Sequence, residues 1–166
     1  MPTEPDRIGL AVCRLGLNAG SGRIQHPVQL GIAIRGALFA ELVLDGRLRG
    51  SRVPTVAGPS DTGNKLADSV HRAVSSRRPT PWKRWYSHVR ADLEAATAAL
   101  VSGGVWRDEG SGRFIDTDPE LANGQAAGIA ELLRLSVPPA EDEDAVVALL
   151  VGGAGPLGGR PRPRAR

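Results

Sequence analysis

The sequence predicts a mainly α-helical, compact domain that carries one short β-hairpin, and three observations predict it. Aromatic residues make up only 4% of the chain and hydrophobic residues 41%, so the core must consist largely of Leu, Val, Ile and Ala. That composition favours packed helices over aromatic-rich sheets. Apolar residues recur at helical spacing in several segments. Near residue 110, two short apolar runs flank a Gly-rich turn, which is typical of a hairpin.

The first half of the chain predicts three helices separated by short extended segments. Residues 6–17 have an apolar helical stripe, and residues 23–25 predict a brief strand. Residues 28–44 are apolar on nearly every side, the pattern of a helix buried all round. Residues 47–56 alternate in part and predict an irregular strand. Residues 60–62 offer N-cap side chains for a third helix. The apolar face of this third helix is formed by Leu66, Val70, Ala73 and Val74.

The second half predicts a long helix followed by the hairpin, an outline similar to a winged helix. The long helix, residues 82–100, ends at Gly103-Gly104, and its stripe consists of Tyr86, Val89, Leu93, Ala96 and Leu100. Residues 105–107 and 113–115 predict the two arms of the hairpin.

Two further helices and a tail are expected after the hairpin. Asp118-Pro119 predicts the start of a helix that reaches Leu135. The acidic run at 141–144 predicts the start of another helix, where the macrodipole favours negative charge. We therefore expect one domain over residues 6–151. Residues 152–166 contain mostly Gly, Pro and Arg, which predicts a disordered basic tail.

The chain has a net charge of +3, and arginine supplies nearly all its cations, because Lys65 and Lys83 are the lysines. Arginine matches the geometry of phosphate and carboxylate better than lysine does. A GC-rich genome produces the same bias, so an arginine is informative only where its position is unusual. The lone Cys13 excludes an intrachain disulfide and a cysteine zinc site.

The N-terminus does not have the pattern of a signal sequence. The longest apolar run, residues 28–44, contains Gln29, Arg35 and Glu41, and this charge content argues against a transmembrane helix. A cytoplasmic protein is therefore expected.

Two motifs resemble nucleotide sites without their chemistry. In residues 58–65 the lysine comes one place too late for a phosphate-binding loop, and Leu66 stands where a metal-binding hydroxyl is needed. Residues 153–158 match a dinucleotide fingerprint by letters only, because no helix is expected after them. The histidines lack metal-ligand spacing and no serine lies in a nucleophile elbow. The sequence therefore predicts neither an enzyme nor a cofactor.

Arg35 is the unusual arginine, since apolar residues surround it in the middle of a predicted buried helix. A buried guanidinium must be paired, because burying it alone costs several kcal/mol. One interpretation is an internal ion pair, with Glu41, Asp92 or Glu94 as the candidate partner. The other is that Arg35 lines a pocket open to an anion.

Three blocks of the sequence resemble the Golgi phosphoprotein 3-like family. Residues 34–48, IRGALFAELVLDGRL, are close to a family signature that begins Leu-Arg-Gly and ends Gly-Arg-Leu. Residues 62–68, TGNKLAD, match a second block, and residues 89–105 match a third. Trp85 lies where bacterial members have a tryptophan. The chain stops sooner after the last predicted helix than family members do, so it resembles a C-terminally short, actinobacterial-type member. A short C-terminus would leave part of the apolar face of the domain exposed. Such an exposed apolar face favours binding of a protein partner or self-association.

The resemblance implies a mostly helical, non-catalytic domain that binds phosphatidylinositol 4-phosphate at a membrane. The family site uses one tryptophan and several arginines. Carried over by position, Arg35 and Arg90 match two of the arginines, His26 stands at the tryptophan position, and Leu93 replaces a further arginine. The predicted site for an anionic headgroup is therefore Arg35, Arg90 and His26.

We accordingly expect a cytoplasmic domain that associates peripherally with anionic phospholipid. A winged-helix DNA-binding protein is the first alternative, because a helix, a Gly-Gly turn and an arginine-bearing hairpin also form a recognition helix and wing. Nucleic acid ranks lower because Asp92 and Glu94 lie where base contacts would be needed. A protein-interaction adaptor without a lipid ligand is the second alternative.

Overall fold

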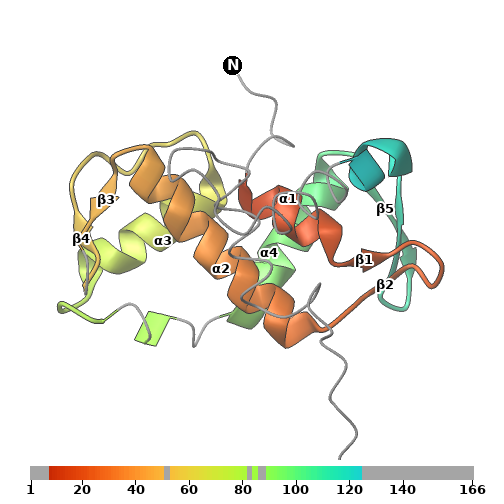
Figure 1. Ribbon diagram of the computed structural model, residues 1–166, viewed down its shortest axis with the longest axis horizontal. Coiled ribbons are helices and arrows are strands. Elements are labelled where there is room, and N and C mark those ends of the chain that lie inside the picture. The colour runs from red at the N-terminus through yellow and green to blue at the C-terminus, as the bar shows by residue number, and fades with distance from the viewer. Residues whose placement is uncertain (1–7, 51–52, 82–83, 86–88, 125–166) are drawn as a thin grey trace, which may run out of the picture.

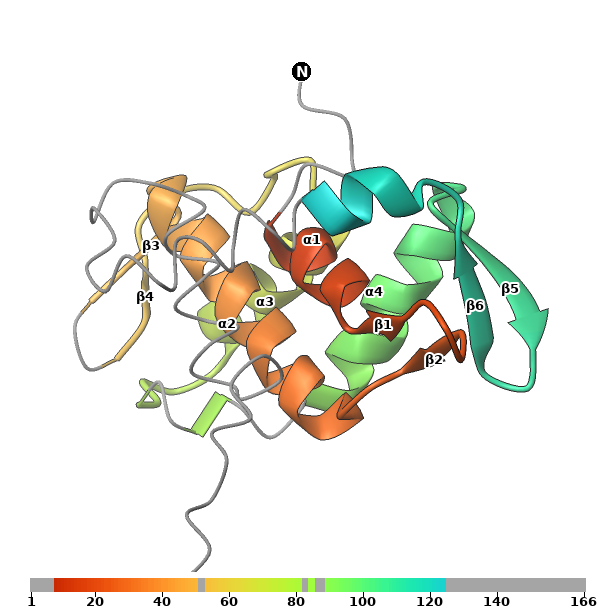
Figure 2. The ribbon, with the colours of Figure 1, turned by 45° about the vertical axis from the view of Figure 1, so that its right-hand side comes forward.

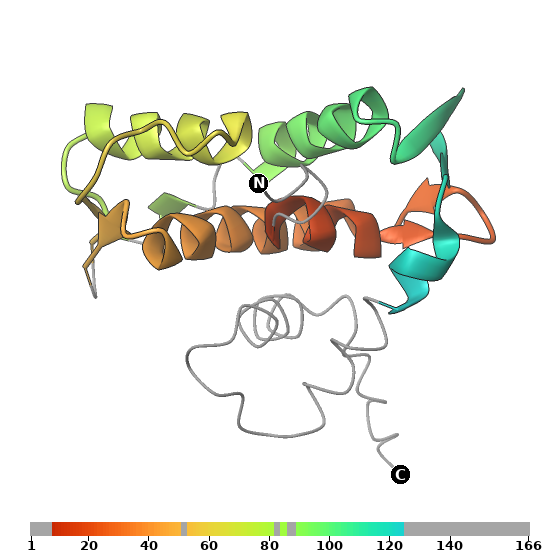
Figure 3. The same cartoon turned by 90° about the horizontal axis from the view of Figure 1, so that it is seen from above.

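A computed structural model describes residues 8–50, 53–81, 84–85 and 89–124, and this part of the chain is mainly helical (Figure 1). The helices lie in two layers, which Figure 3 shows from above. One layer contains α1 (Ile8–Leu15) and α2 (Pro27–Leu44), and the other contains α3 (Lys65–Ser76) and α4 (Val89–Ser102). Small antiparallel hairpins lie at the ends of the two helical layers. The predicted fold class, helical with a short β-hairpin, is confirmed.

Helices α1 and α2 are antiparallel and packed closely through two glycines. A Cβ atom at Gly9 would lie 2.7 Å from a Leu38 methyl carbon, and one at Gly16 would lie 2.1 Å from a methyl carbon of Leu30. The two helices are joined by the short strands β1 (Leu17–Asn18) and β2 (Arg23–Ile24). The predicted strand at 23–25 is therefore present as β2.

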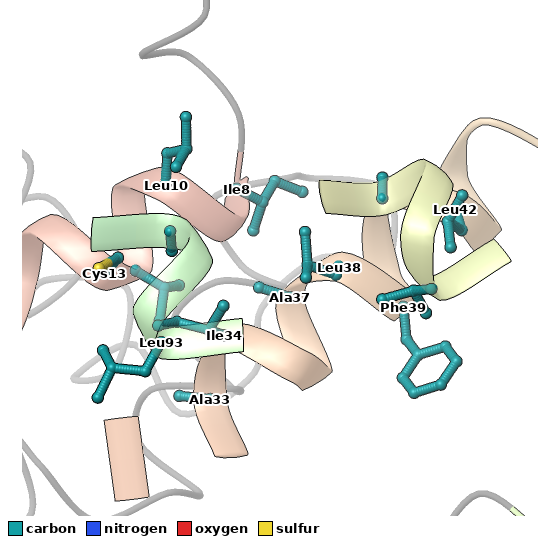
Figure 4. Packing of buried hydrophobic residues seen from close by; sticks show 14 of the residues in the cluster. Ile8, Leu10, Cys13, Ala33, Ile34, Ala37, Leu38, Phe39, Leu42 and Leu93 are labelled. Carbon is teal, nitrogen blue, oxygen red and sulfur yellow. The ribbon is translucent and has the colours of Figure 1, made fainter. Parts of the chain in front are cut away.

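The core is formed where α1, α2 and α4 meet (Figure 4). Cys13, Ile34 and Leu93 contribute to it from these three helices. Helix α2 is long and apolar enough to cross a membrane, but more than half of its length is buried in this protein core. The prediction of a helix buried all round is therefore right for the middle of α2 and wrong at its two ends, where Val28, Ile32, Val43 and Leu44 are exposed.

The structure corrects two local predictions before α3. Residues 47–56 contain two strands, β3 (Leu48–Arg49) and β4 (Thr55–Val56), which pair antiparallel in place of one irregular strand. The cap of α3 is Asn64, whose side chain accepts a hydrogen bond from the Leu66 N–H at 3.0 Å. Thr62, one of the expected caps, instead donates its hydroxyl to Asp68 and shapes the preceding turn.

Helix α4 is described from Val89 onward, and the predicted start near residue 82 lies outside the described residues. Residues 84–85 form a separate short turn, and Trp85 is buried there with its ring edge against Phe39. The indole N–H of Trp85 donates to the Thr80 carbonyl at 3.0 Å and so holds the connector together. Tyr86, expected in the apolar stripe, lies outside the described residues. The remaining stripe is confirmed by the burial of Leu93, Ala96 and Leu100.

The predicted hairpin is present as β5 (Trp106–Gly110) and β6 (Arg113–Asp116). Its two-residue turn contains Ser111 at φ 53° and Gly112 at φ 70°, and positive φ at both positions matches the right-handed twist of the strands. Asp118 then caps a helical segment over residues 119–124. The helix continuation to Leu135, the helix expected after residue 144 and the tail at 152–166 lie outside the described residues.

A buried ion pair joins the hairpin to α1. The Arg14 guanidinium donates to Asp116 through Nε at 2.6 Å and Nη2 at 2.5 Å, and also reaches the Asp118 carbonyl. The indole N–H of Trp106 donates to the same carboxylate at 3.2 Å. Burial is the largest influence on the pKa of Asp116 and raises it, but the hydrogen bond from Arg14, the backbone N–H of Asp118, the Arg14 charge and the Trp106 indole together hold this pKa below its ordinary value.

This pair predicts acid sensitivity. A carboxyl group whose pKa is depressed by folding stabilises the fold at neutral pH, and this contribution is lost as the pH falls below about 4. Asp116→Asn is expected to lower the free energy of unfolding at pH 7 by about 3 kcal/mol and to reduce its decline in acid. Urea titrations across this pH range measure both effects. The exposed Glu120→Gln serves as the control. An Asp116→Asn variant that loses stability in acid as steeply as the wild type would contradict the assignment.

Candidate anion-binding site

Arg35 is buried and joins α2 to α4. Its guanidinium donates to Asp92 through both Nε and Nη2, with Nη2 at 2.7 Å from Oδ1. Arg35 is 5% exposed and Asp92 6%. Of the three acidic partners that the sequence suggested, the structure selects Asp92. Glu41 accepts hydrogen bonds from Gly9 and Asn64.

Close backbone approach makes this pairing possible. Gly31 lies one turn before Arg35, and a Cβ atom there would come within 2.5 Å of the Val89 carbonyl oxygen. The absence of a side chain at Gly31 therefore lets the first turn of α4 rest on α2. Asp92, one turn further along α4, then meets Arg35.

Arg90 lies on the opposite side of α4 and faces solvent. Its side chain is 91% exposed, and its Nε donates to Glu94 at 2.9 Å. An exposed pair at this spacing contributes little to stability, because water competes for both charges. A phosphate group can therefore replace Glu94 as the partner of Arg90 at small cost.

His26 stands at the N-cap of α2 with an exposed side chain that caps no backbone N–H. Its backbone is left-handed, with φ 46° and ψ 56°, and its carbonyl accepts the Leu30 N–H at 2.9 Å. Pro27 follows it, in the favoured first position of the helix. The imidazole is thus available beside the positive end of the helix dipole.

The starts of α2 and α4 lie at the same edge of the molecule, the lower edge in Figures 1 and 2. The connector at residues 77–81 and the turn at 84–85 follow that edge as well. We call this surface the basic edge and define it by exposed cationic or titratable side chains of these segments. Its members are His26, Arg77, Arg78, Arg84 and Arg90.

The structure therefore brings two of the three predicted site residues to one surface and leaves the third inside. His26 and Arg90 belong to the basic edge, whereas Arg35 is enclosed behind it by its bond to Asp92. Arg77 also lies over the ring of Trp85, with 5.3 Å between the guanidinium carbon and the ring centroid. The sequence signal for this contact was the basic run before the tryptophans.

Two cavities lie on the side of the molecule that carries the hairpin, and the wall of the second includes Glu94, the partner of Arg90. One of about 450 Å³ is between the β1–β2 turn and the β5–β6 hairpin, with Leu17, Phe114 and Pro119 in its wall. The other, an apolar groove of about 570 Å³, runs between α4 and the same hairpin. Neither wall contains Arg35, Arg90 or His26.

Cysteine, histidine and acidic side chains elsewhere in the described part of the chain differ in their positions and partners. Among the described residues there is no group of three or more His, Cys, Asp and Glu side chains able to hold a metal ion. Burial raises the pKa of the Cys13 thiol to about 12, despite an opposing influence of the Thr97 side chain, so this thiol is unreactive at neutral pH. His71 is buried, with Nε2 3.0 Å from the Gly58 carbonyl oxygen.

The fold and this surface define a two-layer helical domain with a small hairpin and an arginine-bearing edge. The Golgi phosphoprotein 3 (GPP34) family model matches residues 11–161, and the chain belongs to that family. The family resemblance identified from the sequence is thereby confirmed. No curated protein matches the chain.

Loss of Arg35 is predicted to destabilise the fold. Arg35→Met leaves Asp92 buried without its cation and is expected to lower the free energy of unfolding by about 3–5 kcal/mol. The double variant Arg35→Met/Asp92→Leu is expected to recover much of this loss, since both charges are then removed. Guanidinium titrations of the two variants, with the exposed Arg90→Ala as control, measure the difference. An Arg35→Met variant as stable as the control would show that the pair does not hold α2 to α4.

Proposed function

We propose that this domain associates peripherally with membranes by binding an anionic phospholipid headgroup, similar to phosphatidylinositol 4-phosphate, without a catalytic step. The observation that carries the proposal is Arg90, whose guanidinium is 91% exposed where the first turns of α2 and α4 meet. Membership of the Golgi phosphoprotein 3 family supports the same role. Under this proposal the domain acts at the cytoplasmic face of a membrane.

The three proposed site residues have different roles. Arg90 binds phosphate directly, because its weak surface pair with Glu94 opens at little cost. His26 contributes a hydrogen bond donor at the start of α2. Arg35 acts from behind the surface, since its bond to Asp92 holds the starts of the two helices at a fixed separation.

Two electrostatic contributions strengthen the basic edge beyond Arg90. The N-terminal ends of α2 and α4 both carry the positive end of a helix dipole, which favours anions. The arginines of the connector add attraction of about 1 kcal/mol for each basic side chain near an acidic membrane. The basic edge therefore suits a negatively charged lipid surface better than a neutral one.

The membrane role is preferred over DNA binding because of the charges on the hairpin. Arg107 pairs with Glu109 at 2.7 Å, and the neighbouring Asp108 is exposed as well. These two carboxylates would oppose the phosphates of a DNA duplex at the hairpin, which is the wing of a winged helix.

Vesicle co-sedimentation tests the proposal. The wild-type protein is expected to bind vesicles of phosphatidylcholine with added phosphatidylserine or phosphatidylinositol 4-phosphate, and not phosphatidylcholine alone. Arg90→Ala is expected to weaken binding by about fivefold, the loss of one basic contact. Arg107→Ala is a matched control, because Arg107 is also exposed and paired with a nearby glutamate.

Three results would contradict the proposal. Equal recovery with neutral and acidic vesicles would exclude headgroup binding by charge. Equal losses for Arg90→Ala and Arg107→Ala would place the contact away from the basic edge. Tight gel-shift binding to DNA at physiological salt would favour the winged-helix alternative.

A further inference from the structure

Two large apolar side chains on the first two turns of α2 are exposed to solvent. Val28 is 61% exposed and Ile32 is 36% exposed, whereas Leu30, Ala33 and Ile34 on the same helix are buried. Surface apolar residues are common when they occur singly. These two lie one turn apart on one side of a core helix, so they form a continuous apolar surface.

The same side of α2 continues into the interior. Val28, Ile32, Arg35 and Phe39 follow one another at helical spacing and share one face of the helix. Along the upper half of this face, Asp92 of α4 bonds Arg35 and the Trp85 ring packs on Phe39. Val89 of α4 approaches Gly31, and the lower half of this face, with Val28 and Ile32, is exposed to solvent.

A histidine and an arginine adjoin this open half. His26 precedes Val28 by two residues. Arg90 lies in the first turn of α4, directly after Val89, and Val89 approaches Gly31 of α2. A site for a dissolved phosphate needs the cations alone. Exposed aliphatic side chains next to cations match a phospholipid bilayer, which presents acidic headgroups above hydrocarbon.

We propose that Val28 and Ile32 insert into the boundary between the headgroups and the hydrocarbon of an acidic bilayer while Arg90 binds a headgroup. This inference rests on the proposed membrane association and adds the residues that penetrate the lipid. The occupant of the apolar surface is therefore lipid and not a protein segment. Insertion removes aliphatic surface from water, so it adds affinity that does not depend on salt.

A fluorescent label tests insertion directly. Val28→Cys is labelled with an environment-sensitive nitrobenzoxadiazole group, and the buried native Cys13 does not compete because burial raises its pKa to about 12. Val43→Cys is the control, since Val43 is 46% exposed near the other end of the same helix. With phosphatidylcholine–phosphatidylserine vesicles, the label at position 28 is expected to brighten and shift to the blue. Lipids brominated on their acyl chains are expected to quench it, and to leave the label at position 43 unchanged.

An unlabelled pair of variants gives an independent measurement. Val28→Ser/Ile32→Ser is expected to weaken partitioning onto the acidic vesicles by about tenfold, because two aliphatic side chains no longer enter the lipid. Val43→Ser/Leu44→Ser changes an equally apolar, exposed pair at the far end of α2 and is expected to have no effect. Both pairs are exposed, so thermal melting is expected to show intact folding.

The outcomes separate this inference from the proposed function. Co-sedimentation with acidic vesicles, with an unchanged label at position 28 and an unaffected serine variant, would overturn insertion and leave headgroup binding in place. Failure of the unlabelled wild type to bind acidic vesicles would overturn both. Equal responses at positions 28 and 43 would also overturn the inference, because the contact would not be confined to the start of α2.

Discussion

The ion pair between Arg35 and Asp92 is the interaction on which the arrangement of this domain depends. It joins the central helix of one layer to a helix of the other, across 57 positions of sequence, and both groups are almost fully buried. A buried pair stabilises a structure only when both charges are present and their geometry is good, so it fixes one relative placement of the two helices. That placement puts the first turns of α2 and α4 side by side and creates the basic edge.

This constraint gives the conspicuous arginine of the family signature a structural meaning. The sequence suggested either an internal ion pair or an open anion pocket for Arg35, and the described structure contains the internal pair. The positive charge of the basic edge comes from exposed side chains, namely Arg90 and the arginines of the connector. A single short stretch of α4 therefore does two things, since Asp92 points inward to Arg35 while Arg90 points outward to solvent.

Local pattern was sufficient to predict much of the fold. The helix at 28–44 and the hairpin near residue 110 follow from apolar spacing and turn residues, which depend on neighbours in sequence. The cap of α3 was predicted too early in the sequence, because several polar side chains precede that helix. The backbone conformation of the preceding turn determines that Asn64 is the cap. The partner of Arg35 was narrowed to three acids, and the choice depends on the close approach at Gly31. The exposure of Val28 and Ile32 was not predictable, because α2 is apolar on every side.

One surface, formed by the starts of α2 and α4, is proposed to contact acidic membrane. Hydrogen–deuterium exchange of the full chain with and without phosphatidylserine-containing vesicles tests this most directly. Protection is predicted for the backbone amides of residues 28–32 and 90–92, with no change in the hairpin at 106–116. Protection of the hairpin, with unchanged exchange at the two helix starts, would contradict the account.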